Sequence, residues 1–248
     1  MWTRTEAPVN RRGDSLLLEF LAAMPSVKLV VFDIAGTIIE DHREVAQAFS
    51  RALRKNGIPF TEDELKEWKG ASKREVIRHF IEQLGPNGDV ADKVETTYRC
   101  FRTELESLYG ARINPIEGAP ATFAWCRDRG ILMATTTGFY REVSDLILDK
   151  MGWWNLFAAN ISSSDVPRGR PAPFMIFRAM EAAGVQSVQQ VVSVGDTPLD
   201  LQSGSNAGVR GVVGVLTGAH TRERLQRERH THILQSIAAL PALLESSF

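Results

Sequence analysis

The pattern of hydrophobic and polar residues begins with a short apolar run. Residues 28–33 read KLVVFD, a run of strand length that ends on an aspartate. From about residue 44 to residue 112, apolar positions recur at helical spacing, and no strand-like run separates them. Within this stretch, Thr61 and Glu64 form a capping-box pattern that marks a helix start. The first part of the chain therefore predicts one strand followed only by helices.

Strands and helices alternate after Pro115. Apolar runs of strand length occupy residues 131–135, 158–162, 191–194 and 209–215, with a last short one at 233–234. Repeated strand–helix units predict a parallel sheet with helices on both faces. The predicted fold class is therefore α/β, a Rossmann-like parallel-sheet core with an all-helical cap inserted after the first strand.

This order divides the chain into three expected parts. Residues 1–14 mix charged and apolar residues and are expected to form a mobile arm. Residues 15–43 and 113–248 are expected to form the core domain, with a short helix at 15–25. Residues 44–112 form the expected helical cap domain.

Composition and charge exclude several classes of function. The 248 residues are 44% hydrophobic with a formal net charge of −1, so a core can be buried and nothing in the charge favours nucleic acid. No apolar run approaches the length of a membrane span, so we expect no membrane partner. Cys100 and Cys126 lack metal-ligand spacing and are typical of reduced, cytoplasmic surroundings.

An aspartate ends the first predicted strand, at the edge where ligands bind in open parallel sheets. Asp33 is followed by a turn through Gly36. A carboxylate in this position can attack phosphorus and form an aspartyl-phosphate. The same residue can instead cap a helix or stabilise a turn, and the motif alone leaves both interpretations open.

Two further segments supply groups that can hold a phosphate. Thr135, Thr136, Thr137 and Gly138 end a predicted strand that enters a helix, where hydroxyl and backbone N–H groups can bind an anion. Arg170 lies beside a later helix start, where a guanidinium can hold phosphate and neutralise its charge. An ordinary threonine-rich strand end and a solvated loop arginine are the alternatives.

Two carboxylates follow the predicted strand at 191–194. Asp196 and Asp200 are four residues apart in the sequence GDTPLD. Such oxygen ligands suit Mg²⁺, which keeps several waters and binds one or two carboxylates together with substrate oxygens. The alternative is a capped helix start with Asp200 on its surface.

The four segments together resemble the haloacid dehalogenase (HAD) superfamily. In that pattern an aspartate after a buried strand is followed by hydroxyl groups, a cation and GDxxxD, and the resemblance covers residues 28–215. The superfamily usually has an aspartate where this chain has Ala35, and a lysine where it has Arg170. Both departures, with the strings DIAGT, TTTG and GRPAP, are similar to the phosphonoacetaldehyde hydrolase (phosphonatase) family.

This resemblance implies a set of roles. Asp33 is the implied nucleophile, and Asp33, the Ala35 carbonyl and Asp196 are the implied ligands of Mg²⁺. Asp200 is expected to orient the metal's surroundings, and Arg170 is expected to act with the nucleophile on the phosphoryl group. The family also implies a homodimer through the cap.

Ala35 has a chemical consequence. In the phosphate-ester members of the superfamily, the aspartate that it replaces protonates the leaving alkoxide and later activates water, and a methyl group can do neither. The leaving group must then be good by itself or be made good by another residue. An imine between an aldehyde and a lysine does this, because its cationic nitrogen draws electrons from a C–P bond.

Lys73 is the candidate for that lysine. Residues 70–73 (GASK) match the G-x-x-K pattern of the phosphonatase cap loop, and Ser72 with Glu75 forms a capping box that makes Lys73 the first helical residue. The positive end of the helix dipole and burial under a cap both favour the uncharged amine that imine formation needs. A surface lysine without a reactive role is the alternative.

Two positions differ from the phosphonatase pattern. Val76 stands where the family has a histidine, and Phe139 stands where it has a tyrosine, so the polar network around an imine is expected to differ. The sequence favours an Mg²⁺-dependent, phosphonatase-like hydrolase that cleaves the C–P bond of phosphonoacetaldehyde or a related phosphonate. A HAD phosphatase acting on a small phosphate monoester is the alternative, and a non-catalytic binding protein on the same fold is a third.

Overall fold

The computed structural model describes residues 27–248 except 69–70, 86–88 and 219. The expected arm at 1–14 and the expected helix at 15–25 lie outside the described residues. Six strands form one sheet in the order β3-β2-β1-β4-β5-β6, and every neighbouring pair is parallel. The predicted α/β fold with a parallel sheet is therefore confirmed.

The strands lie close to the predicted runs. They are β1 (Leu29–Phe32), β2 (Leu132–Thr137), β3 (Ala159–Ser162), β4 (Val191–Gly195), β5 (Gly211–Val215) and β6 (His232–Leu234). The helices that follow or precede them are α6 (Ala119–Asp128), α7 (Arg141–Lys150), α8 (Phe174–Ala182), α9 (Pro198–Ala207), α10 (Arg222–Leu225) and α11 (Leu240–Ser247). Single 3₁₀ turns are η1 (Trp154–Leu156), η2 (Ser163–Asp165), η3 (Val188–Gln190) and η4 (Ile237–Ala239).

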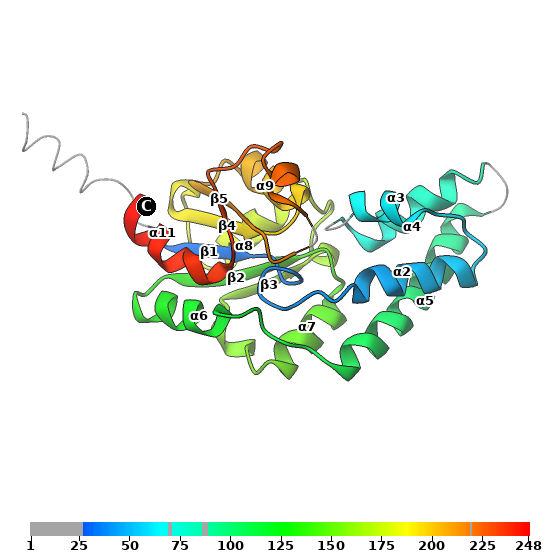
Figure 1. Ribbon diagram of the computed structural model, residues 1–248, viewed down its shortest axis with the longest axis horizontal. Helices are drawn as coiled ribbons and strands as arrows, with labels where there is room; N and C mark the ends of the chain where they lie inside the picture. The colour runs from blue at the N-terminus through cyan, green and yellow to red at the C-terminus, as the bar shows by residue number, and fades with distance from the viewer. Residues whose placement is uncertain (1–26, 69–70, 86–88, 219) are drawn as a thin grey trace, which may run out of the picture.

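The central strand β1 is buried on both faces, as a continuous apolar run in a parallel sheet requires. Val30 and Phe32 point to the core that α6, α7 and α11 complete, where the Phe32 and Phe123 ring centroids are 5.6 Å apart. Leu29 and Val31 point to the opposite core under α8 and α9. Helices thus cover both faces of the sheet (Figure 1).

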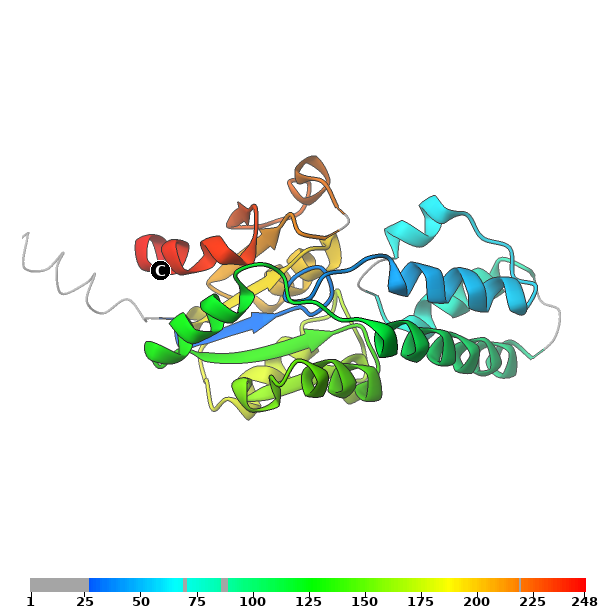
Figure 2. The same ribbon diagram turned by 60° about the horizontal axis from the view of Figure 1, so that its bottom comes forward.

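Among the described residues between β1 and β2, the regular elements are all helices. Before α6, which packs on the sheet, they are α2 (Glu44–Lys55), α3 (Glu62–Glu67), α4 (Lys73–Glu82) and α5 (Val90–Ala111). These helices lie beyond the carboxyl end of β1 (Figure 2). The predicted all-helical insertion after the first strand is therefore confirmed, while the domain boundaries at 44 and 112 stay a prediction. Among the described residues, no helix is long and apolar enough to span a membrane.

The two capping boxes predicted in this insertion have different outcomes. The Thr61 hydroxyl accepts the Glu64 N–H, and the Glu64 carboxylate accepts the Thr61 N–H, so that box is confirmed. Ser72 is the N-cap of α4, but its side chain makes no capping hydrogen bond, so the second box is wrong. Ser72 lies close to the loop before α8 instead, since a Cβ atom at Gly169 would be 3.6 Å from Ser72 Cβ.

The packing of Phe101 between α5 and α2 is expected to stabilise the insertion. Its side chain on α5 is fully buried, and its ring centroid lies 4.3 Å from that of Phe49 on α2. Phe101→Ala is expected to lower the free energy of unfolding by about 3–5 kcal/mol, measured by urea denaturation, because it leaves a cavity. Arg99→Ala, an exposed position on the same helix, is the control and should stay within about 0.5 kcal/mol. An equally small effect for Phe101→Ala would contradict the packing described.

Candidate active site

The register of the sheet gathers the predicted site at one edge. Phe32 pairs with Thr135 on β2 and with Val194 on β4, so the residues that follow these three lie at the same level along the strand direction, at the carboxyl edge of the sheet. The Asp33 N–H donates to the Val194 carbonyl at 2.8 Å and continues the strand pairing by one residue. Asp33 therefore lies between the ends of β2 and β4.

Three carboxylates meet at this edge. Asp33, Asp196 and Asp200 each offer an oxygen, and these atoms lie within 4.8 Å of one another. All three side chains are buried, with residue exposures of 6%, 0% and 7%. The alternative of a surface position for Asp200 is therefore wrong. Its carboxylate accepts the N–H and hydroxyl of Thr197 at the start of α9, which fixes the carboxylate beneath the site.

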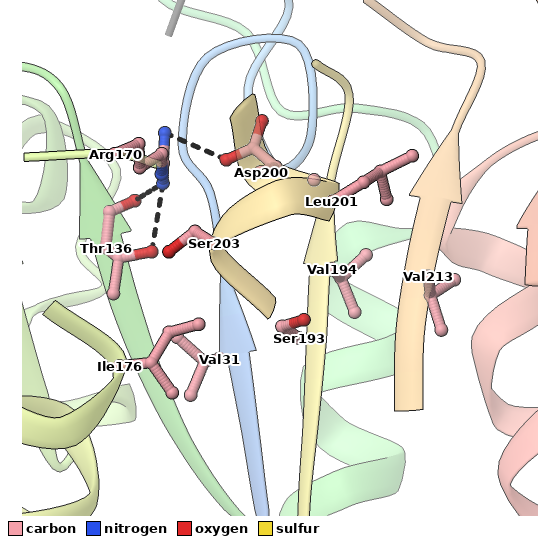
Figure 3. Close-up of a pocket in the computed structure, with 11 residues that line it drawn as sticks. Val31, Thr136, Arg170, Ile176, Ser193, Val194, Asp200, Leu201, Ser203 and Val213 are labelled. Atoms are coloured by element: carbon pink, nitrogen blue, oxygen red, sulfur yellow. Dashed lines mark hydrogen bonds and ion pairs between the residues drawn. The ribbon is translucent and has the colours of Figure 1, made fainter. Parts of the chain in front are cut away.

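Arg170 enters the same cluster from the loop before α8. Its Nη1 lies 2.8 Å from Asp33 Oδ1 and 2.9 Å from Asp200 Oδ1. Its Nη2 donates to the backbone carbonyl and the hydroxyl oxygen of Thr136, at 2.8 and 2.9 Å. Figure 3 shows the guanidinium between Thr136 and Asp200. The buried cation thus joins the ends of β1 and β2 to the start of α9.

The small cavity beneath Arg170 in Figure 3 is not the substrate site. Its volume is about 10 Å³, and its lining combines Arg170 and Asp200 with apolar residues of the sheet such as Val31 and Val213. A space of this size holds at most one water molecule. Substrate must approach the carboxylates from the side of the helical insertion.

The cluster carries more negative than positive charge. Burial raises the pKa of Asp33 to about 6, with Arg170 opposing this rise and the field of Asp200 adding to it. Burial also raises the pKa of Asp200, and the field of Asp196 adds to that rise. One guanidinium among three carboxylates leaves two excess negative charges when all three are ionised. A divalent cation would neutralise them.

The donor set fits Mg²⁺. Carboxylate oxygens are the hard ligands that this ion prefers, and three of them converge here. Arg170 engages one oxygen each of Asp33 and Asp200, so the second Asp33 oxygen and Asp196 are the first candidates for metal contact. The predicted contribution of the Ala35 carbonyl stays a prediction.

The loop after β5 closes over Asp196, which the sequence did not indicate. A Cβ atom at Gly218 would lie 1.7 Å from Asp196 Oδ2, and one at Gly36 would lie 2.7 Å from it. Gly36 also has a φ of +87°, a conformation that favours glycine. The Thr217 hydroxyl donates to the Gly36 carbonyl at 2.6 Å and joins the two loops. Gly218, three residues beyond the end of β5, was the available signal for this contact.

The four predicted phosphate-binding residues separate into two groups. The Thr135 hydroxyl donates to Asn160 Oδ1 at 2.7 Å on the neighbouring strand, so its expected role at the phosphate is revised to a structural one. Thr136 faces Arg170, and the Thr137 hydroxyl oxygen accepts the Phe139 N–H at 3.1 Å. The Ser163 hydroxyl donates to the Phe139 carbonyl at 3.1 Å and ties the loop at Gly138 to the end of β3. Thr136, Thr137 and Gly138 remain the candidates for phosphate contact.

Lys73 reaches the site from the helical insertion. It is the first residue of α4 and only 6% exposed, so the alternative of a surface lysine is wrong. Its Nζ donates to the Ala71 carbonyl at 3.3 Å and lies 5.3 Å from the ring centroid of Phe139. Phe139 directly follows Gly138, so the ammonium group lies beside the candidate phosphate loop.

Known proteins resemble this chain in sequence. A sequence model of the haloacid dehalogenase-like hydrolase family matches residues 30–214. Phosphonoacetaldehyde hydrolase from Bacillus cereus (strain B4264) is 29% identical over 211 residues, covering 78% of this chain and 77% of that protein.

Solved structures show the same fold. A phosphonoacetaldehyde hydrolase-like protein from Oleispira antarctica superposes with a TM-score of 0.79 at 23% identity, covering 90% of this chain and 92% of that one. A predicted phosphoglycolate phosphatase from Haemophilus somnus 129pt has a TM-score of 0.75 at 19% identity, covering 89% and 99%. With the family match over most of its length, the chain belongs to the haloacid dehalogenase-like hydrolase family.

Proposed function

We propose that this hydrolase cleaves the C–P bond of phosphonoacetaldehyde or a closely related phosphonate. One observation carries the proposal: the amine of Lys73, buried at the start of α4, lies beside the loop that follows β2. A phosphonate held at that loop would have its carbon end toward the lysine. The Bacillus cereus relative named phosphonoacetaldehyde hydrolase supports the same substrate.

Ala35 supports the choice of a C–P bond over a phosphate ester. A methyl side chain two residues after the nucleophile cannot protonate a leaving alkoxide. A carbon leaving group needs an electron sink instead, and an imine on Lys73 supplies one.

In the proposed reaction, the Lys73 amine adds to the aldehyde carbon and water leaves, which forms the imine. The Asp33 carboxylate attacks phosphorus, the C–P bond breaks, and its electron pair moves into the enamine. Water then releases phosphate from the aspartyl-phosphate. Protonation of the enamine carbon and hydrolysis release acetaldehyde and restore Lys73.

The chain's own groups support each step. Arg170 holds Asp33 in place and neutralises charge on the phosphoryl oxygens, as Thr136 and Gly138 would with their O–H and N–H groups. Asp33 and Asp196, with Asp200 behind them, would hold Mg²⁺, which supplies charge neutralisation when bound. A homodimer through the cap stays a prediction.

A phosphatase that acts on a small phosphate monoester is the second candidate. The solved relative described as a predicted phosphoglycolate phosphatase has the same fold and favours it. In that case Lys73 would be a charged substrate contact, and another acid would have to protonate the leaving alkoxide in place of the aspartate that Ala35 replaces.

Borohydride trapping separates the two candidates. With phosphonoacetaldehyde and sodium borohydride, the enzyme is expected to lose activity and carry a reduced adduct on the Lys73 peptide, read by mass spectrometry. Lys73→Arg keeps the charge but cannot form an imine, so it should give no adduct and no C–P cleavage. Robust turnover of phosphate monoesters by both proteins, without an adduct in either, would favour the phosphatase.

Metal binding predicts a second outcome. Mg²⁺ at 100 times its dissociation constant should stabilise the folded protein by about 2.7 kcal/mol, seen as a rise in melting temperature. Asp196→Asn should lose most of this rise because it removes a charged ligand. Asp149→Asn removes an exposed charge from α7 and should keep it. An undiminished rise in Asp196→Asn would refute the assigned metal site.

The charge on Asp33 predicts a pH dependence in metal-free protein. Its pKa is raised from 3.8 to about 6, so the folded state loses stability as pH rises through that interval and the carboxyl ionises. The Asp33→Asn side chain does not ionise, so the variant does not lose this stability. In EDTA, its free energy of unfolding minus that of the wild type should therefore be larger at pH 7.5 than at pH 4, by up to about 3 kcal/mol, measured by urea unfolding. A difference that does not grow with pH would contradict the burial of this charge.

A further inference from the structure

A groove extends from Lys73 along the helical insertion. It lies between α2 and α3, its volume is about 610 Å³, and its walls include Phe49, Leu65, Trp68 and Lys73. Lys73 lines this groove and also lies beside the candidate phosphate loop, so the groove adjoins the candidate active site. A substrate longer than phosphonoacetaldehyde would extend from the lysine into the groove.

The groove is larger than a two-carbon phosphonate needs. Cavities of about 300–1,000 Å³ hold ligands of drug size. Phosphonoacetaldehyde has only an aldehyde and one methylene beyond its phosphorus. The volume therefore leaves room for a longer organic part on the side of the lysine.

The described lining of the groove is basic. Arg43, Arg51, Arg54, Lys66 and Lys73 line it, against the acids Asp41 and Glu62. Such an excess of positive charge attracts anionic ligands. Three of the cations are already engaged by acids of the insertion: Arg51 with Glu104, Arg54 with Glu62, and Lys66 with Asp63.

Arg43 differs from these three. It is exposed, and it makes no ion pair with any acid in the part of the chain that the structure describes. Its φ of +73° makes it the one non-glycine residue with positive φ among the described residues. The backbone there is held by the Arg43 N–H, which donates to Asp41 Oδ1 at 2.9 Å, and by the His42 N–H, which donates to Glu44 Oε2 at 2.8 Å. A strained and fixed backbone thus presents an uncommitted guanidinium to the groove.

We propose that the natural substrate carries a second anionic group, a carboxylate at the far end of its organic part, and that Arg43 binds this group in the groove. This inference rests on the proposed function, which holds the phosphoryl group at the end of β2 and directs the organic part of the substrate past Lys73. A guanidinium and a carboxylate form paired, charge-assisted hydrogen bonds, so Arg43 would select for the carboxylate. The substrate class is then a carboxylated phosphonate longer than phosphonoacetaldehyde, with a ketone in place of the aldehyde as the carbon that Lys73 attacks.

Binding of unreactive ligands tests this without the imine chemistry. We would titrate the Mg²⁺-loaded protein calorimetrically with ω-carboxyalkylphosphonates that have two to four carbons between phosphorus and carboxylate. Each is compared with the alkylphosphonate of the same length. At the best length the carboxylated ligand is expected to bind about tenfold tighter or more in the wild type.

The variants assign that preference to one side chain. Arg43→Ala should reduce the ratio of the two affinities to about one, while Arg43→Lys should keep part of it. Arg99→Ala removes the same charge from an exposed position on α5, outside the groove, and should leave the ratio unchanged. A ratio that survives Arg43→Ala, or a wild type without preference at any length, would overturn the proposal.

The outcome is separate from that of borohydride trapping. A preference for the carboxylate that depends on Arg43, without an adduct on Lys73, would keep the groove site and remove the imine. An adduct on Lys73 without that preference would keep C–P cleavage and remove the second anionic group.

Discussion

A guanidinium buried among carboxylates is the constraint on which the rest of the structure depends. Arg170 and its partners Asp33 and Asp200 are almost fully removed from water, and each would be costly to bury without the others. The backbone around these charged groups packs closely against them, and glycines at two positions make this close approach possible. Gly195 allows α9 to approach, since a Cβ atom there would lie 2.3 Å from Asp200 Cβ, and Gly218 allows the loop after β5 to cover Asp196.

The sheet and the helical insertion contribute different residues to the candidate active site. In the proposed function, the parallel sheet positions the phosphorus chemistry through strand register, which any relative with the same sheet can share. Lys73 and the basic groove of the helical insertion would then decide what the phosphorus is attached to. Proteins described as a phosphonoacetaldehyde hydrolase-like protein and as a predicted phosphoglycolate phosphatase therefore both share the fold of this chain, at 23% and 19% identity to it. Substrate identity has to be argued from the insertion.

Much of this could be predicted from the sequence because it depends on local patterns and on one topological rule. Apolar runs located the strands, and parallel pairing brings their ends to one edge, so Asp33, Asp196 and Asp200 were expected together. What escaped prediction depends on contacts between distant segments. The Thr135 hydroxyl donates to Asn160, Ser72 lies close to Gly169 and does not cap α4, and Gly218 lies against Asp196. No local pattern encodes such contacts.

In the proposed mechanism the Asp33 carboxylate receives the phosphoryl group beside a cation held by Asp196. A crystal structure of the protein with Mg²⁺ and beryllofluoride, a mimic of an aspartate-bound phosphoryl group, would show both features at once. We expect beryllium bonded to an Asp33 oxygen, its fluorines near Arg170 and the loop at Gly138, and the metal bound by Asp196. Beryllofluoride absent from Asp33, or a metal bound away from Asp196, would refute this mechanism.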